Sequence, residues 1–507
     1  MRRVPILSGS RVVVCPVDDE DVVIRPPPPP ARTVDTSPAV RDALRFPLSG
    51  PPLGALATRG TRATIVVEPP ALPLPSATPD PRQDALAAVI AELEECGVPD
   101  LQQTILVAGG LGRRLARREL ERLLLRPQAR AFRGRVLVHD VEDPNLVGIA
   151  GGARVSPALT EADVVVVVSA AETVLHGGPS ALVASCDADT VRAASAGRSL
   201  LEAAGSTGWR DALQLEAAIG EKTALVGVSL VLDLPRLTGA LAGYPHDVFA
   251  ADRVAHSPLR AAFSRLPGFV RRDILASRGC RLAATAAFAG LPSTAHAEAL
   301  VRGVELRGAR IREPLDALIV GAPWVGPSVP REPANPITAA AVTLGLVLRL
   351  HRGELPVRPG GTVILCHPLV RTFAHGAQAP YAAMFNVLRA APGMAELAEA
   401  ERGAARDAGF IAAYKAGKAC HPQLPYADWA GCAPVLSTVG RVVVAGCRDA
   451  IAARTLGFVP SHSLASALEM AHGVAGGRAR VGILLAPPYA PILVGEGEAS
   501  LAPTPMD

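Results

Sequence analysis

A histidine and a cysteine ten residues apart are the first candidates for chemistry in this chain. His176 precedes Gly177-Gly178, and Cys186 is followed closely by two aspartates. An imidazole can act as an acid or base, and a thiolate can ligate a soft metal ion. A buried cysteine also behaves as a small hydrophobic side chain. The pattern therefore indicates His176 as a candidate acid or base, and His176 with Cys186 as a candidate metal site. Ordinary packing is the alternative.

A glycine-rich turn is the second candidate. The apolar run Ile105–Ala108 leads into Gly109-Gly110-Leu111-Gly112, and the spacing predicts a helix over Arg113–Leu125. Backbone N–H groups at such a junction can bind an anion, so Gly109 and Gly110 are candidate cofactor-binding residues. The last glycine of the dinucleotide fingerprint is absent. A tight structural turn explains the segment equally well.

Two Cys-His pairs, Cys366-His367 and Cys420-His421, are weaker candidates for a metal site. Zinc ligands are usually separated by two to four residues. Adjacent side chains on a strand point to opposite faces, so both members of a pair would not easily reach one ion.

Strands and helices alternate along the segment that must position these residues. Apolar runs predict strands at Ala63–Val67, Thr104–Ala108 and Ala162–Val168, and a helix at Asp84–Cys96. The run Val164–Val168 has no polar member, which is typical of a strand covered on both faces. We therefore expect a doubly wound sheet in which these three strands are parallel neighbours.

A second α/β set follows further along the chain. Thr362–Cys366 and Arg441–Ala445 are predicted to be strands of a second sheet, and Pro336–Leu350 is predicted to be a buried apolar helix. The expected fold class is thus α/β, with two α/β domains of mainly parallel sheets facing each other across a cleft.

The length of 507 residues also favours two domains. We expect an N-terminal arm at 1–50, a first domain at 51–275 and a second domain at 276–507. The arm should form a hairpin from Val12–Cys15 and Val22–Ile24, followed by the proline spacer Pro26–Pro30, and should pack on the first domain.

Composition excludes several classes of function. The net charge is only +4, and no basic run alternates with aromatic residues, so a nucleic-acid partner is not expected. No run of 18 apolar residues is present, so a membrane partner is not expected either. The eight cysteines form no Cys-x-x-Cys pair and no signal peptide precedes them, which favours the cytoplasm. Nothing in the composition indicates the oligomeric state.

The order of features from about residue 4 to residue 494 resembles the lactate racemase family, a group of 2-hydroxyacid racemases and epimerases. The segments that carry the resemblance are the turn at 109–112, Val136–Asp140, the loop Gly151–Arg154, Leu175–Gly178, Pro359–Leu365 and Leu456–Glu469.

The resemblance implies an isomerase acting on a small 2-hydroxy acid such as lactate. Members of the family carry a nickel pincer nucleotide, tethered through a lysine, that accepts a hydride from the substrate. Two histidines serve as acid and base on opposite faces of the substrate. A loop with an aspartate and an arginine, after the first strand, holds the nucleotide phosphate.

Only one residue of this site is retained in the chain. His176 stands at one of the family's two histidines. Every other position that the resemblance implies differs: the second histidine is Leu111, the tether lysine is Cys186, the phosphate-binding aspartate and arginine are Pro69 and Leu72, and a glutamine and a lysine that face the cofactor are Ala339 and Val342. A thiolate at Cys186 could still ligate nickel or hold a cofactor through sulfur. Glu68, beside the loop, would repel a phosphate if it were ionised.

Three hypotheses about function follow. The chain is a 2-hydroxyacid racemase or epimerase with altered cofactor tethering, or a catalytically silent relative that binds a small acid or a partner protein. The third hypothesis is a different isomerase or metal-dependent enzyme that uses the same cleft, with Cys186 and His176.

Overall fold

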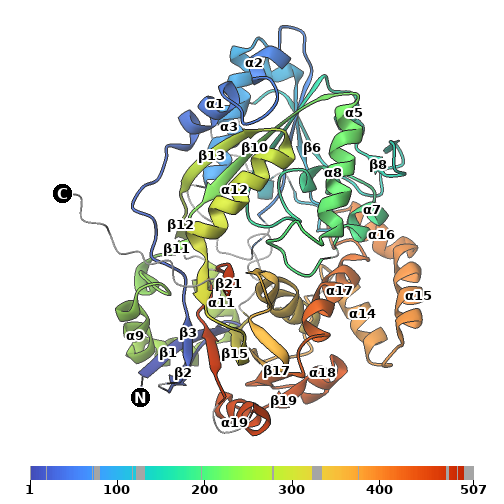
Figure 1. The fold of residues 1–507 in the computed structure, drawn as a ribbon. Coiled ribbons are helices and arrows are strands. Elements are labelled where there is room, and N and C mark those ends of the chain that lie inside the picture. Colours follow the sequence, from blue (N-terminus) through green and yellow to red (C-terminus); the bar gives the residue numbers. More distant parts are fainter. Residues whose placement is uncertain are drawn as a thin grey trace, which may run out of the picture.

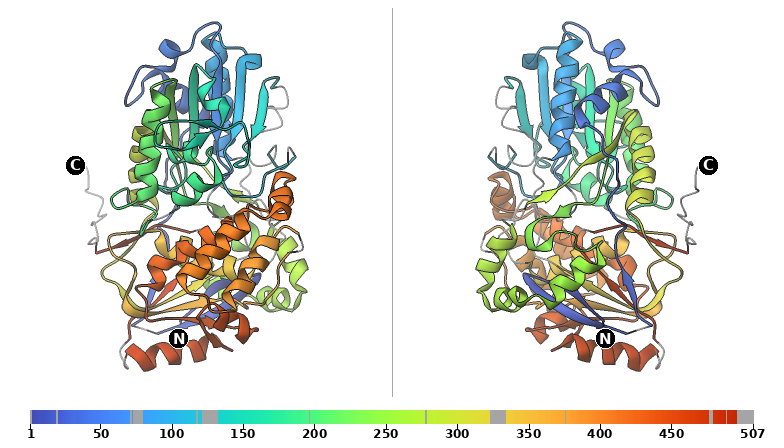
Figure 2. Two further views of the ribbon diagram at one scale, coloured as in Figure 1. Left: turned by 90° about the vertical axis from the view of Figure 1, so that its right-hand side faces the viewer. Right: turned by 90° about the vertical axis from the view of Figure 1, so that its left-hand side faces the viewer.

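The protein consists of two stacked α/β domains in the computed structural model (Figure 1). The structure describes residues 2–18, 20–70, 72, 80–116, 118–120, 132–195, 197–276, 279–322, 334–374, 376–475, 479–487 and 489–495. The side views of Figure 2 show the first domain, drawn mostly in blue to green, above the second, drawn mostly in orange and red. The expected α/β class with mainly parallel sheets is confirmed.

The first domain is built on a six-stranded sheet with the order β13-β10-β9-β4-β5-β6. Its strands are β4 (Ala63–Val67), β5 (Gln103–Val107), β6 (Arg135–Val138), β9 (Val164–Ala170), β10 (Ala224–Leu232) and β13 (Ala284–Gly290). β4 pairs in parallel with both β5 and β9, as predicted. Only β13 runs antiparallel, beside β10.

Helices cover both faces of this sheet, which is why its strands are apolar throughout. Ile65 packs with helices α1 (Thr36–Arg45) and α3 (Pro81–Glu95). Val66, its neighbour, points to the opposite face and packs with α6 (Ser180–Val183) and α8 (Thr207–Gly220). Alternating side chains of one strand thus enter two separate cores.

The second domain contains a six-stranded, fully parallel sheet with the order β19-β18-β17-β15-β20-β3. Its strands are β3 (Val22–Ile24), β15 (Leu315–Gly321), β17 (Val357–Cys366), β18 (Arg441–Ala445), β19 (Val459–Ser461) and β20 (Val481–Leu484). The predicted pairing of Thr362–Cys366 with Arg441–Ala445 is confirmed. Helices α13 (Pro336–Ala340), α14 (Ala379–Leu388) and α17 (Leu424–Leu436) lie toward the first domain, and α19 (Leu464–Ala475) packs on the other face.

The remaining elements are short or peripheral. They are α2 (Leu53–Leu56), β7 (Val147–Gly148), β8 (Arg154–Val155), α5 (Pro157–Thr160), α7 (Ala188–Ala193), β14 (Ala309–Ile311), β16 (His351–Arg352), α15 (Met394–Ala405), α16 (Ala408–Lys415), α18 (Ala450–Thr455) and β21 (Ile492–Val494), with 3₁₀ turns at 100–102 and 239–241. None of the helices in the described part of the chain combines the length and apolar character needed to cross a membrane.

The N-terminal arm differs from the prediction. The hairpin is formed by β1 (Arg2–Ser8) and β2 (Arg11–Val17), joined at Gly9, whose φ of +58° suits a tight turn. The segment Val22–Ile24, expected in the hairpin, is instead the edge strand of the second sheet. The hairpin packs on the second domain rather than the first, because Val4 and Ile6 enter the core beneath β15. The N-terminus accordingly lies at the second domain in every view (Figures 1 and 2).

The predicted boundary at 275/276 is also wrong, because the chain crosses between the domains several times. Helices α9 (Val248–His256), α10 (Pro258–Arg265) and α11 (Gly268–Ala276) follow the first sheet in sequence, and α9 and α10 contact the β1–β2 hairpin of the second domain. The antiparallel pair β11 (Arg236–Leu237) and β12 (Cys280–Arg281) lies where the chain leaves the first domain and where it returns to that domain. β13 and α12 (Pro292–Arg307) then rejoin the first domain, since β13 completes the edge of its sheet.

Two predicted helices also differ from the structure. The segment Pro336–Leu350 is one turn of α-helix followed by a π-helical stretch (Ala341–Leu346) and a 3₁₀ turn (Val347–Arg349). Residues 113–116 are not helical, and helix is present only at 118–120 in the described part of that segment. Arg113 pairs there with Glu119, which also accepts from the Ala116 N–H, so local side-chain bonds compete with a regular helix.

The packing of the hairpin on the second sheet can be tested at Gly321, at the end of β15. A β-carbon at this position would clash with the Leu7 carbonyl and with Ile6. We expect Gly321→Ala to lower the free energy of unfolding by about 1–3 kcal/mol, because the backbone of the hairpin must move. The measurement is urea denaturation followed by circular dichroism.

Gly403, which is exposed in α15 and has nothing near its missing β-carbon, is the control. Gly403→Ala should raise the stability by about 0.5–1 kcal/mol. Equal effects of the two substitutions would contradict the placement of the hairpin.

Candidate functional site

A cavity of about 480 Å³ lies between the domains and is lined by residues of both. The first domain contributes Glu68, which follows β4, the turn after β5, and His176. The second domain contributes Val342 and Arg349 from the π and 3₁₀ segment, Tyr381 from α14 and Asp428 from α17. Ligands of open parallel sheets usually bind beyond the carboxyl ends of the strands, which is where this cavity adjoins β4 and β5.

Arg349 connects the two domains at the wall of this cavity. Its Nη2 donates to the Gly197 carbonyl of the first domain at 2.7 Å, and Nε donates to the Arg198 carbonyl at 3.3 Å. Its Nη1 donates to the Gly345 and Gly431 carbonyls of the second domain. No carboxylate in the described part of the chain forms an ion pair with it, although the side chain is only 4% exposed. Burial lowers the pKa of Arg349 to about 10, so the guanidinium remains charged at neutral pH.

Asp428 and Tyr381 form a hydrogen-bonded pair on the second-domain wall. The Tyr381 hydroxyl donates to Asp428 Oδ2 at 2.5 Å. Burial raises the pKa of Asp428 to about 6, and the hydrogen bond from Tyr381 opposes that rise. Burial and the neighbouring Asp428 carboxylate raise the pKa of Tyr381 well above its usual value, so the hydroxyl keeps its proton and acts as the donor.

Glu68 is the acid on the first-domain wall. The Gly177 N–H donates to Glu68 Oε2 at 2.6 Å. Burial raises the pKa of Glu68 to about 8, against the effect of that hydrogen bond and with a smaller contribution from Glu172. The nearby Arg82 is engaged elsewhere, since it pairs with Asp80 at 3.0 Å and Glu172 at 3.2 Å. Glu68 is therefore neutral near pH 7, and the repulsion of anions expected for an ionised carboxylate does not apply.

His176 lies where the sequence placed it, at the cavity. Its ring is open to the cavity, and Nδ1 is hydrogen-bonded with the Thr173 hydroxyl at 3.0 Å. The enclosing walls lower the pKa of the imidazole, so it is neutral at pH 7. His176 keeps the chemical capacity of an acid or base.

Cys186 does not reach the cavity. Its side chain is fully buried in the core between the first sheet and α8, with Val66 and Leu106. The thiol lies 3.5 Å from the Leu182 carbonyl, and burial raises its pKa far above the usual range. His176 and Cys186 are thus not brought together, and no group of three metal-ligating side chains occurs among the described residues.

Gly109 and Gly110 line the cavity, but the turn differs from an anion-binding loop. The Gly110 N–H donates to the Ala184 carbonyl at 3.2 Å, and the Gly112 N–H donates to the Gly109 carbonyl at 3.0 Å. Residues 113–116, which follow the turn, are not helical, so no helix N-terminus lies directly at the turn. The turn instead joins the domains, because the Leu111 carbonyl accepts from the His421 N–H at 2.9 Å.

The other positions singled out by the resemblance are apolar in the structure. Leu111 and Val342 line the cavity with side chains that are 4% and 7% exposed. Pro69 lines it as well, whereas Leu72 and Ala339 are buried in the large core that includes the second domain. Leu111, Val342 and Pro69 give the cavity hydrophobic walls around a few polar groups, as is usual for small-molecule sites.

Three polar residues of the cavity were missed by sequence reasoning. Arg349 lies in an apolar run that was interpreted only as a buried helix, and a single arginine in such a run was the available signal. Asp428 and Tyr381 carry no motif, because they meet only through the packing of α14 and α17.

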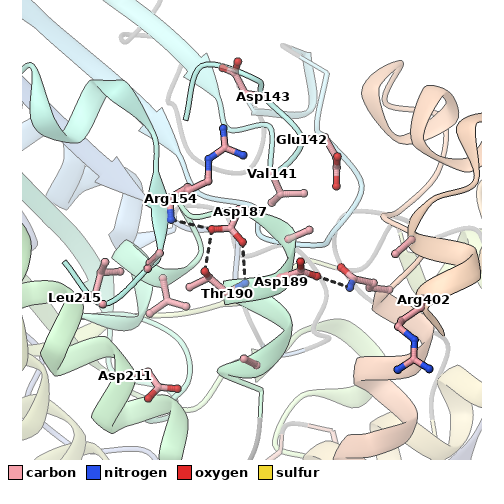
Figure 3. A pocket seen from close by; sticks show the side chains of 18 of the residues that line it. Val141, Glu142, Asp143, Arg154, Asp187, Asp189, Thr190, Asp211, Leu215 and Arg402 are labelled. Atoms are coloured by element: carbon pink, nitrogen blue, oxygen red, sulfur yellow. Dashed lines mark hydrogen bonds between the residues drawn. The ribbon is translucent and has the colours of Figure 1, made fainter. Parts of the chain in front are cut away.

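A larger, open cavity of about 1260 Å³ lies beside α7, α8 and α15. Figure 3 shows its acidic residues and Arg402, and Asp187 hydrogen-bonded with Thr190 and the backbone of Arg154. These bonds cap α7, and Asp189 accepts from Gln423 of the second domain at 3.0 Å. The carboxylates of this groove therefore hold local structure and the domain contact.

The raised pKa of Glu68 predicts a pH dependence of stability. The pKa is about 8 in the folded protein and 4.5 in the unfolded chain. Between these values the folded state keeps a proton that the unfolded state releases. The contribution of Glu68 to stability is therefore complete below pH 4.5 and is lost as the pH rises through 8.

The variant Glu68→Gln should remove this loss. We expect the Tm of the variant relative to wild type to rise by at least about 2 °C between pH 5 and pH 8, measured by thermal unfolding. Glu161→Gln, at an exposed carboxyl, is the control and should show no such trend. A Tm difference for Glu68→Gln that is constant with pH would refute the neutral state of Glu68.

Comparisons with known proteins agree with the resemblance. Residues 9–173 match the family described as the lactate racemase N-terminal domain. The structure is similar to the lactate racemase apoprotein from Thermoanaerobacterium thermosaccharolyticum, with a TM-score of 0.59 and 14% sequence identity over 97% of this chain and 100% of that chain. It is also similar to a structural-genomics crystal structure of a protein from Thermotoga maritima, with a TM-score of 0.50 and 13% identity over 91% of this chain and 100% of that one. A search of curated protein sequences finds no match. The N-terminal part of the chain is thus similar to the lactate racemase N-terminal domain, and nearly its whole length has the fold of the lactate racemase apoprotein.

Proposed function

We propose that this chain binds a small carboxylic acid, such as a 2-hydroxy acid, in the interdomain cavity and does not carry out nickel-dependent racemisation. The observation that carries the proposal is the charge of Arg349, which lies buried at the cavity wall and, among the described residues, has only carbonyl oxygens as partners.

Arg349 has the capacity to bind one more acceptor. A guanidinium carries five N–H groups, and four carbonyl oxygens accept from it. A buried cation without a counter-charge is unfavourable, so a carboxylate beside it would be stabilised. Leu111 and Val342 would contact the apolar part of such an acid.

The residues at this site do not fit the nickel pincer nucleotide of the family. The tether position is Cys186, whose thiol is in the core, and the expected phosphate anchors are Pro69 and Leu72. The N–H groups of Gly110 and Gly112 already bind carbonyl oxygens. One of the two catalytic histidines is replaced by Leu111. Together these placements support a relative in which the scaffold is retained without the family's chemistry.

The hypotheses that use Cys186 have less support. A racemase with a sulfur-tethered cofactor, or a metal enzyme with His176 and Cys186, would need the thiol in the cavity, and it lies in the core. A protein partner in place of a small acid has no comparable feature in its favour. We also propose a cytoplasmic location, which suits the eight free cysteines.

We predict no measurable interconversion of D- and L-lactate by the purified protein, even after co-expression with the enzymes that build the family's cofactor. Positioned proton transfer contributes about 10²–10⁴-fold to a rate, and Leu111 cannot supply it. The double variant Leu111→His, Cys186→Lys should remain inactive, because Pro69, Leu72, Ala339 and Val342 also differ. The assay is chiral chromatography. Racemisation by wild type above a no-protein control would contradict this prediction.

Binding should depend on Arg349. We expect Arg349→Met to weaken lactate binding by about 10–100-fold, since a hydrogen bond to a charged group contributes about 1.5–3 kcal/mol. Isothermal titration calorimetry measures the affinity, and thermal unfolding checks that the domains stay assembled. Arg402→Met is the matched control, because Arg402 is an exposed residue of the larger cavity beside α7, α8 and α15, called the outer groove below. Equal affinities of the two variants would count against the site.

A further inference from the structure

Two carboxyl groups, one from each domain, line the cavity that contains Arg349. Glu68 belongs to the first-domain wall and Asp428 to the second-domain wall. Each is held by a single donor to one oxygen: Gly177 N–H donates to Glu68 Oε2, and Tyr381 O–H donates to Asp428 Oδ2. Neither carboxyl is paired with an arginine or lysine within the described part of the chain. Among the described residues, the second oxygen of each carboxyl accepts no hydrogen bond.

We propose that Glu68 and Asp428 form an acid–base pair that interconverts the keto and enol forms of a small 2-oxo acid whose carboxylate is held by Arg349. This proposal rests on the proposed function only for the binding of the acid. It assigns the cavity an activity that needs neither a metal nor a hydride acceptor.

The two carboxyl groups are suited to opposite roles. The pKa of about 8 leaves Glu68 protonated near pH 7, whereas the pKa of about 6 leaves most Asp428 molecules ionised. Two carboxyl groups whose environments separate their pKa values can act as general acid and general base in one site. His176, also on the first-domain wall, is neutral and adds no second positive charge to the cavity.

The reaction is balanced without a co-reactant. Asp428 takes a proton from C3 of the 2-oxo acid, and the electrons of the broken C3–H bond form the C2=C3 double bond. The electrons of the carbonyl π bond move to the C2 oxygen, which takes the proton of Glu68 as the Glu68 O–H bond breaks. The product is the enol, with Asp428 protonated and Glu68 ionised. Exchange with water restores both groups.

A 2-oxo acid suits this pair better than a 2-hydroxy acid. A C–H bond next to a ketone is far more acidic than the C2–H bond of a hydroxy acid, because the carbonyl oxygen takes up the negative charge. Arg349 would fix the carboxylate, and Glu68 would neutralise the developing charge on the C2 oxygen. The apolar side chains of Leu111 and Val342 exclude water around C3.

The test is the exchange of the pyruvate methyl hydrogens for deuterium in D₂O, followed by proton NMR. Wild type should accelerate the loss of the methyl signal at least tenfold over buffer. Glu68→Gln and Asp428→Asn should each lower the accelerated rate by about 10²-fold or more. Both variants should bind pyruvate within a few-fold of wild type. Asp211→Asn, in the outer groove, is the matched control and should leave the rate unchanged.

Each outcome decides the proposal. Binding of pyruvate by wild type without exchange overturns the acid–base pair but leaves the proposed function intact. Exchange that survives both substitutions overturns it as well. No binding of pyruvate or lactate by wild type overturns both proposals. If Asp428→Asn does not fold, Tyr381→Phe, which removes only the hydroxyl on Asp428, should lower the exchange rate with binding retained.

Discussion

The interaction on which the site depends is the contact of Arg349 with carbonyl groups of both domains. The guanidinium joins residues 197–198 of the first domain to Gly345 and Gly431 of the second. Next to it, the Leu200 N–H donates to the Arg349 carbonyl, and the Ser199 hydroxyl donates to the His351 carbonyl. These bonds set the separation of the two walls, and therefore which side chains can reach one ligand. The Arg349 guanidinium also places a positive charge at the wall of the cavity.

Contacts on the other flank of the cavity oppose a change in this separation. Arg192 pairs with Glu401 at 2.5 Å, and His421 contacts Glu142 at 3.0 Å. The Leu111 backbone takes part in the same contact, because its carbonyl accepts from the His421 N–H. Because interdomain bonds flank the cavity on both sides, it is suited to a ligand small enough to enter without large domain motion.

The chain has the fold of the lactate racemase apoprotein at only 14% sequence identity, because fold and site depend on different residues. Strands such as β9 need only apolar side chains that fill both cores. The side chains that line the cavity, such as Leu111 and Val342, are set by different requirements from those of the sheets. The same scaffold can therefore hold a different set of polar groups at the ends of its strands.

The parallel strands of the first sheet could be predicted from the sequence alone. Uninterrupted apolar runs such as Val164–Val168 predict buried strands, because only a sheet covered on both faces accepts them. The N-terminal hairpin could not be predicted in the same way, since its register depends on Gly9 and its location on the surface of a sheet some 300 residues further along.

Which side chains face the cavity, and how they are protonated, depends on the tertiary structure. Whether Cys186 faces the cavity or the core depends on the packing of α6 and α8, which no local pattern encodes. The protonation of Glu68 arises from enclosure and from the Gly177 N–H, more than 100 residues away. Arg349 and Asp428 are brought together within the second domain, where the segment 341–349 packs on α17, and Glu68 lines the same cavity only once the domains are joined. Burial and charge pairing are properties of that joined state, and they decide what the cavity can bind.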